Sequence, residues 1–66
     1  MTDTLDILLN RLKARQRDLI LEAARVDALP AHSTIRQIAE LENAIAAVEA
    51  VTAEEAERER AGRPAA

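Results

Sequence analysis

The sequence predicts an all-α fold in which two long helices form an antiparallel hairpin, and two hairpins form a dimeric four-helix bundle. Three observations predict it. Pro30 divides the 66-residue chain near its middle, and apolar residues recur at helical spacing on both sides of it. Ala, Leu, Glu and Arg dominate the composition, and all of them favour helices. A short connection between consecutive helices makes them antiparallel neighbours.

The first helix is predicted to run from about Thr4 to Ala28. Hydroxyl and carboxylate side chains near its start suit an N-cap, and Asp6 lies in the first turn, where the helix dipole favours negative charge. Leu29 ends it, because the residue before a proline is disfavoured in helical geometry. Its apolar stripe is Leu5, Leu8, Leu9, Leu12, Leu19, Ile20, Ala23 and Val26, and a thinner stripe on the opposite side is Ile7, Ala14, Leu21 and Ala28.

The second helix is predicted to follow a turn at residues 29–33 and to run from about Thr34 to Ala61. Thr34 is the expected N-cap, with Gln37 three residues later as in a capping box. Gly62 is expected to supply a left-handed C-cap, and residues 62–66 a frayed tail. The apolar stripe of this helix is Ile38, Leu41, Ile45, Val48, Thr52 and Ala56.

The prediction of a dimer depends on how the two stripes face each other. With the turn centred near residue 32, facing residues have numbers that add to roughly 64, so Leu19 meets Ile45. Leu12 then meets Thr52, and Leu5, Leu8 and Leu9 meet the charged stretch 54–60, so these four leucines have almost nothing apolar opposite them. Burying each leucine is worth roughly 1.5–3 kcal/mol. A second copy of the chain is therefore expected to cover them.

The predicted interface consists of the leucine-rich half of the first helix: Leu5, Leu8, Leu9, Leu12, Gln16 and Leu19. Within it, Gln16 has two interpretations. It fixes the register and the number of subunits, or it lies at the edge of the stripe and reaches water. The same leucine-rich half also fits a protein partner that receives a helix in an apolar groove.

The composition offers little for catalysis or for binding cofactors and metals. The chain has no cysteine and one histidine, which excludes disulfides, thiolate metal sites and a zinc site. His32 in the turn is expected to be an ordinary surface residue, since its neighbours provide no nucleophile–base geometry. No apolar run approaches the ~20 residues of a membrane span, and the start of the chain lacks a basic secretory signal. We expect a cytoplasmic protein that is not an enzyme.

One basic cluster supports a second functional class, a small nucleic-acid-binding regulator. Its members are Arg11, Lys13, Arg15 and Arg17. The alternative is a solvated surface paired with acids of the second helix. The net charge of −3, the absence of aromatic residues for base stacking and the spread of the four cations around the helix all favour this alternative. Residues 34–41 are also similar to the first helix of a helix-turn-helix, but no turn and second helix follow them.

The short hairpin layout is similar to that of plasmid copy-number regulators of the Rop type, a likeness of architecture without a shared motif. This likeness belongs with the second functional class. The first functional hypothesis is a non-enzymatic protein–protein interaction module, or a small regulatory or adaptor protein, that acts through a self-associating helical hairpin.

Overall fold

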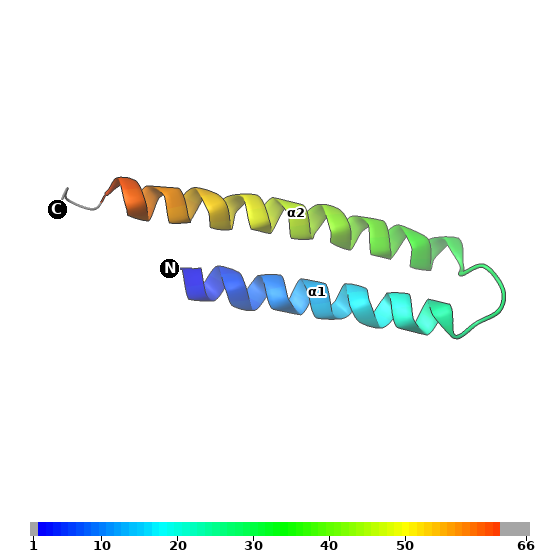
Figure 1. The fold of residues 1–66 in the computed structure, drawn as a ribbon. Coiled ribbons are helices and arrows are strands. Elements are labelled where there is room, and N and C mark those ends of the chain that lie inside the picture. The colour runs from blue at the N-terminus through cyan, green and yellow to red at the C-terminus, as the bar shows by residue number, and fades with distance from the viewer. Residues whose placement is uncertain (1, 63–66) are drawn as a thin grey trace.

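The computed structural model describes the backbone of residues 2–62 and the side chains of residues 4–62. It contains two helices, α1 (Thr2–Ala24) and α2 (His32–Ala61). They lie side by side and antiparallel, joined by residues 25–31 at one end (Figure 1). The predicted all-helical architecture with two packed helices is confirmed. Neither helix combines the length and the apolar character that a membrane crossing needs, over the residues that the structure describes.

The end of α1 differs from the prediction, because the helix stops at Ala24 rather than Ala28. Arg25 and Val26 donate their backbone N–H groups to the carbonyls three residues earlier, at 3.2 and 3.3 Å, and the chain then leaves the helix. Pro30 fixes its own φ and disfavours helical geometry at Leu29, but it does not determine at which earlier residue the helix ends. Helices are stabilised mainly by packing of an apolar face, and Val26 packs against little, with 60% of its surface exposed.

The ends of α2 also differ in detail. The N-cap is Ala31, which has extended backbone and no side-chain cap, and its carbonyl accepts hydrogen bonds from Thr34 and Ile35 at 3.0 and 3.1 Å. The prediction of Thr34 as the cap is wrong, because the helix starts two residues earlier. At the other end Gly62 is right-handed (φ −81°, ψ −8°), so the predicted left-handed cap is wrong as well. The rest of the predicted frayed tail, residues 63–66, lies outside the described residues.

The two helices meet along a seam with the heptad spacing of a coiled coil. In α1 the half-buried or buried residues alternate four and three apart: Leu5, Leu9, Leu12, Gln16, Leu19 and Ala23. In α2 the matching series is Thr34, Ile38, Leu41, Ile45, Val48 and Thr52. This spacing and the contacts of Gln16 and Lys13 described below define the register of the two helices. In this register the numbers of two residues that face each other add to about 57.

This register corrects the prediction that the N-terminal leucines lack apolar partners. Because α1 ends four residues earlier than predicted, the centre of the turn moves toward Ala28, and every facing pair moves with it. In this register Leu12 faces Ile45, and Leu9 faces Val48. Three of the four leucines therefore lie in the seam of their own chain. The fourth, Leu8, lies outside it.

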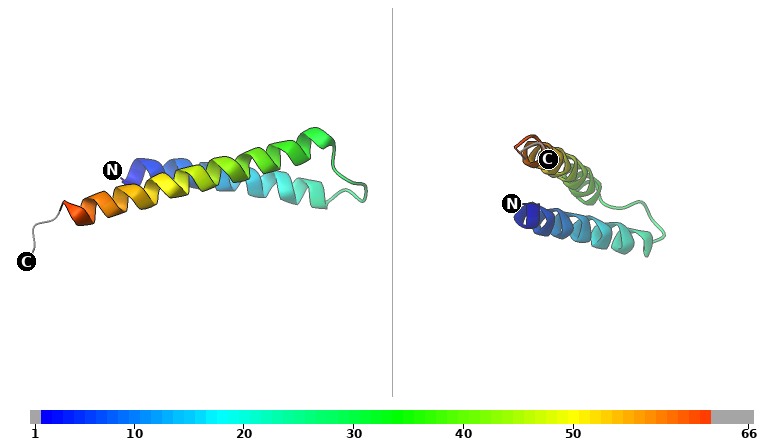
Figure 2. Two further views of the ribbon diagram at one scale, coloured as in Figure 1. Left: turned by 90° about the horizontal axis from the view of Figure 1, so that it is seen from above. Right: turned by 60° about the vertical axis from the view of Figure 1, so that its left-hand side comes forward.

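The hairpin is long and thin, with extents of 59 × 15 × 15 Å. Over the described residues only Leu19 and Ile45 are buried, at 6% and 5% exposure. The last turns of α2 extend past the start of α1, as Figure 1 and the left view of Figure 2 show. This extension contains i,i+3 ion pairs of its own, Glu55 with Arg58 at 4.0 Å and Glu57 with Arg60.

Candidate interaction surfaces

The heptad seam divides the rest of the hairpin surface into two flanks and the outer sides of the helices. In an antiparallel pair each flank combines residues from both helices. We call one flank the bridged face and the other the open face. The bridged face is formed by Lys13 and Ile20 of α1 and by Ile35, Glu42 and Glu49 of α2. The open face is formed by Leu8, Arg11, Arg15, Asp18 and Glu22 of α1 and by Gln37, Glu40, Ala44, Ala47 and Val51 of α2.

Polar contacts join the two helices across the bridged face. The Nζ atom of Lys13 lies 3.4 Å from a carboxylate oxygen of Glu49. The side-chain amide of Gln16 donates to Oε1 of Glu42 at 2.9 Å and to the backbone carbonyl of Ile38 at 3.3 Å. Polar side chains of α1 on this flank therefore already have partners on α2.

Gln16 occupies a seam position and is half-buried, with both of its hydrogen bonds directed to α2. A polar side chain in a seam favours the alignment that satisfies it and disfavours alignments that leave it facing apolar residues. The geometry thus favours the interpretation in which Gln16 helps to set the register of the hairpin.

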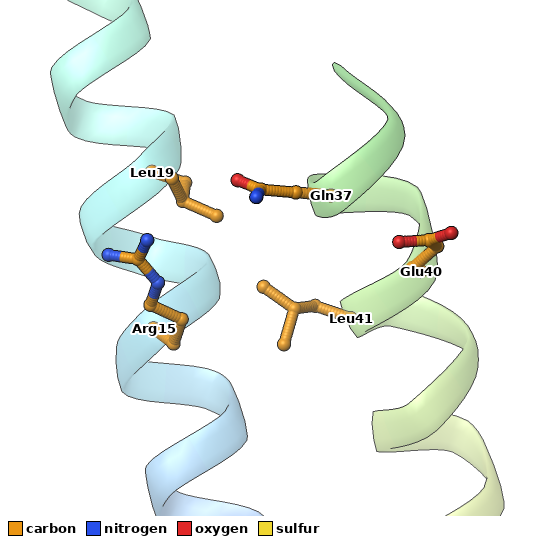
Figure 3. A pocket seen from close by; sticks show the side chains of 5 residues that line it. All are labelled: Arg15, Leu19, Gln37, Glu40 and Leu41. Atoms are coloured by element: carbon orange, nitrogen blue, oxygen red, sulfur yellow. The ribbon is translucent and has the colours of Figure 1, made fainter. Parts of the chain in front are cut away.

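The open face has no such bridge among the described residues, since neither Arg11, Arg15 nor Glu40 forms an ion pair within the chain. Here the groove between the helices widens into an opening of about 290 Å³. Leu19 and Leu41 point toward each other at its centre, and Arg15 and Glu40 lie at opposite rims on α1 and α2 (Figure 3). The opening thus has an apolar base and two rim charges of opposite sign.

Large apolar side chains remain exposed on several sides of the hairpin, with exposures of 42% to 90%. They are Ile7, Leu8, Ile20, Leu21, Val26, Leu29, Ile35 and Val51. Of these, Leu8 and Val51 belong to the open face, where they lie on either side of the groove at nearly the same height. Ile7 and Leu21 form the thin stripe predicted on the outer side of α1.

The six predicted interface residues are divided by the structure into two groups. Five lie in the seam between α1 and α2: Leu5, Leu9, Leu12, Gln16 and Leu19. Leu8 is 42% exposed on the open face. The structure also identifies Ala44 and Val51 as surface neighbours of this groove, which sequence reasoning missed. The heptad phase of α2 contains the necessary signal, because Ala44 and Val51 each directly precede a seam position, Ile45 and Thr52.

The four cations of the basic segment lie on different sides of α1. Lys13 is paired with Glu49 on the bridged face, whereas Arg11 and Arg15 lie on the open face. Arg17 is two residues beyond Arg15, which at 100° per residue turns it away from that face. The segment therefore does not present one line of positive charge to a phosphate backbone.

The turn shows no arrangement suited to catalysis. His32 is exposed at the first position of α2, and its Nε2 lies 3.2 Å from a guanidinium nitrogen of Arg36 on the next helical turn. No group of His, Cys, Asp and Glu side chains that could hold a metal ion occurs among the described residues.

Comparison with family models, with curated proteins and with solved structures finds no match. The packing and the charge of the hairpin itself are therefore the basis for proposing a function.

Proposed function

We propose that this chain is a non-enzymatic interaction module, a helical hairpin that associates with a second copy of itself to form a four-helix bundle. The observation that carries the proposal is the contrast in burial. Among the side chains of residues 4–62, two are buried, whereas eight large apolar ones are at least 42% exposed. Scattered exposed apolar residues are common, but a core of two buried residues is small for an independently stable fold.

The surface area of the chain supports the same proposal. The accessible surface is 5370 Å², whereas a compact monomer of 7.2 kDa exposes about 4,100 Å² by the usual scaling with mass. The surplus is roughly 1,200 Å² per chain. A standard protein interface removes about 800 Å² from each partner, so the hairpin has enough surplus surface for one.

A second copy is the partner that needs the least additional assumption. Two hairpins that stack face to face bury one flank of each, and all four helices then acquire neighbours on two sides, as in four-helix bundles. The lack of cysteine excludes disulfides as an alternative source of stability for so small a fold.

Thermal unfolding followed by far-UV circular dichroism over a hundredfold range of concentration tests the proposal. If folding is coupled to dimerisation, the Tm rises with chain concentration by mass action. A Tm that stays constant over the range would contradict the proposal. A chain that stays monomeric and helical, and binds only a different protein through its apolar surface, would also overturn it.

A further inference from the structure

The open face and the charges on its rims lead to a specific arrangement of the dimer, which rests on the function proposed above. We propose that two copies stack through their open faces with both turns at the same end, so that α1 of each copy lies on α2 of the other. The alternative has the turns at opposite ends, with α1 on α1 and α2 on α2. Small side chains on the open face and the cost of desolvating the bridged face favour the choice of face, and charge favours the choice of orientation.

The open face is the better of the two flanks to bury. Ala44 and Ala47 are small, so a second helix can approach α2 closely there. Exposed apolar area does not separate the two flanks, since Leu8 and Val51 are each 42% exposed on the open face and Ile20 and Ile35 are 45% and 46% exposed on the bridged face. On the bridged face, by contrast, stacking would remove water from the ion pair of Lys13 and Glu49, and desolvating an ion pair is costly.

Stacking with both turns at the same end uses a two-fold axis along the bundle. Each residue of α1 then lies at the height of the residue of the partner's α2 that it faces within its own hairpin. Leu8 comes within about 3 Å of the height of Val51 of the partner subunit, at 1.5 Å per residue. Arg15 comes equally close in height to Glu40 of the partner subunit. Apolar side chains therefore meet apolar side chains, and opposite charges meet twice.

The opposite orientation brings like charges together. With the two α1 helices centred on each other, Arg15 lies against Arg11 of the partner subunit, and Leu8 lies at the height of Asp18 of the partner subunit. The two α2 helices also become neighbours, and each contains seven glutamates against three arginines. Repulsion between like charges across an interface disfavours this pairing.

The first test exchanges the two rim charges. Arg15→Glu alone and Glu40→Arg alone each replace attraction by repulsion at two symmetric positions. Asp18, on the outer edge of the same flank, offsets part of the native attraction. We therefore expect each variant to raise the dimer Kd about tenfold.

An equimolar mixture of the two variants restores both pairs, because Glu at position 15 then meets Arg at position 40 of the other copy. The mixture should dimerise with a Kd near that of the natural chain, which a contact within one chain cannot produce. The matched control is Lys13→Glu, which makes the same charge change on the bridged face of the same helix. Its dimer Kd should change less than threefold. A mixture that dimerises no better than its components would overturn the proposal. So would an Arg15→Glu variant that dimerises more tightly than the natural chain, the result expected for the opposite orientation.

The second test measures the orientation directly. Leu29 lies in the turn, is 90% exposed, and the chain has no other cysteine to label, so a spin label on Leu29→Cys reports the position of the turn alone. Turns at the same end place the two labels within about 25 Å, given helix spacings of 8–10 Å. Turns at opposite ends separate them by at least the length of α1, about 35 Å.

The outcomes separate this proposal from the one it rests on. A dimer with the short distance supports both. A dimer with the long distance overturns the stacking and leaves the self-association intact. A labelled chain that shows no intermolecular distance, together with a monomeric natural chain, overturns the proposed function itself.

Discussion

Replacing Gln16 by leucine tests the energetics of the seam, because two opposing effects can be compared from the structure. Gln16→Leu removes hydrogen bonds to Glu42 and to the carbonyl of Ile38. Both acceptors still have hydrogen-bond donors after the substitution. The carboxylate of Glu42 is exposed and can be hydrated, and the carbonyl of Ile38 lies within α2, where the helix provides a donor. The loss is therefore at the low end for each of the two hydrogen bonds, about 0.5 kcal/mol each and about 1 kcal/mol together.

The gain comes from placing an apolar side chain in the seam opposite Leu41. Complete burial of a leucine is worth roughly 1.5–3 kcal/mol, and the position is half-buried, so we take about half of this value. Removing a half-buried amide adds a further gain. The net expectation is a stabilisation of about 1 kcal/mol, which raises the Tm by roughly 4–8 °C in a chain of this size.

Thermal unfolding of Gln16→Leu at fixed chain concentration, followed by circular dichroism, measures this effect. The matched control is Gln16→Glu, which keeps the length of the side chain but removes the donor and places a second carboxylate beside Glu42. Its Tm should fall. A Gln16→Leu variant that melts below the natural chain would refute the reasoning, and would mean that the cross-helix hydrogen bonds contribute more than the apolar contact that replaces them.

Three further substitutions test the register and the surface contacts. Ile45→Ala should lower the free energy of unfolding by about 2–4 kcal/mol, because Ile45 is buried, whereas Ile35→Ala should lower it by less than about 1 kcal/mol. Equal losses for the two variants in chemical denaturation would contradict the assignment of Ile45 to the seam. Leu12→Asp places a charge in the seam and should abolish most of the helical circular dichroism signal, while Ile7→Asp on the outer side of α1 should preserve it. Glu49→Ala removes the exposed partner of Lys13 and should shift the free energy of unfolding by less than about 0.5 kcal/mol. A loss above about 2 kcal/mol would contradict the expectation that this exposed ion pair contributes little to stability.

The hairpin could be predicted from the sequence because its determinants are local and repeated. Many consecutive helix-forming residues precede and follow a single proline, and the apolar spacing persists over several turns. The end of α2 at Ala61 also agrees with the prediction, since Gly62 follows it directly.

The end of α1 could not be predicted, because nothing local distinguishes Arg25 from the residues before it. The helix stops where packing against α2 stops, and packing is a property of the folded hairpin. An error of four residues at this end moves the centre of the turn. The numbers of two facing residues then add to about seven less, which is a shift of one heptad. Apolar residues then still face apolar residues near the turn, so the pattern of Leu19 and Ile45 alone does not expose the error.

The candidate surfaces followed from the register more than from composition. The apolar spacing predicts Leu8 in the same stripe as Leu5 and Leu9, but the alternation of four and three residues assigns it to the open face. The sequence likewise does not show on which face of the hairpin each cation of the basic segment lies. Its members are adjacent in sequence, and only the structure separates the bridged Lys13 from Arg15 on the open face.

Sedimentation equilibrium of the natural chain across a wide range of concentrations tests the central claim most directly, with detection by peptide absorbance because the chain lacks Trp and Tyr. We predict a molar mass that approaches twice 7.2 kDa at high concentration and falls toward 7.2 kDa, with loss of helix, on dilution. A mass of 7.2 kDa at every concentration, with helix content unchanged, would contradict the account.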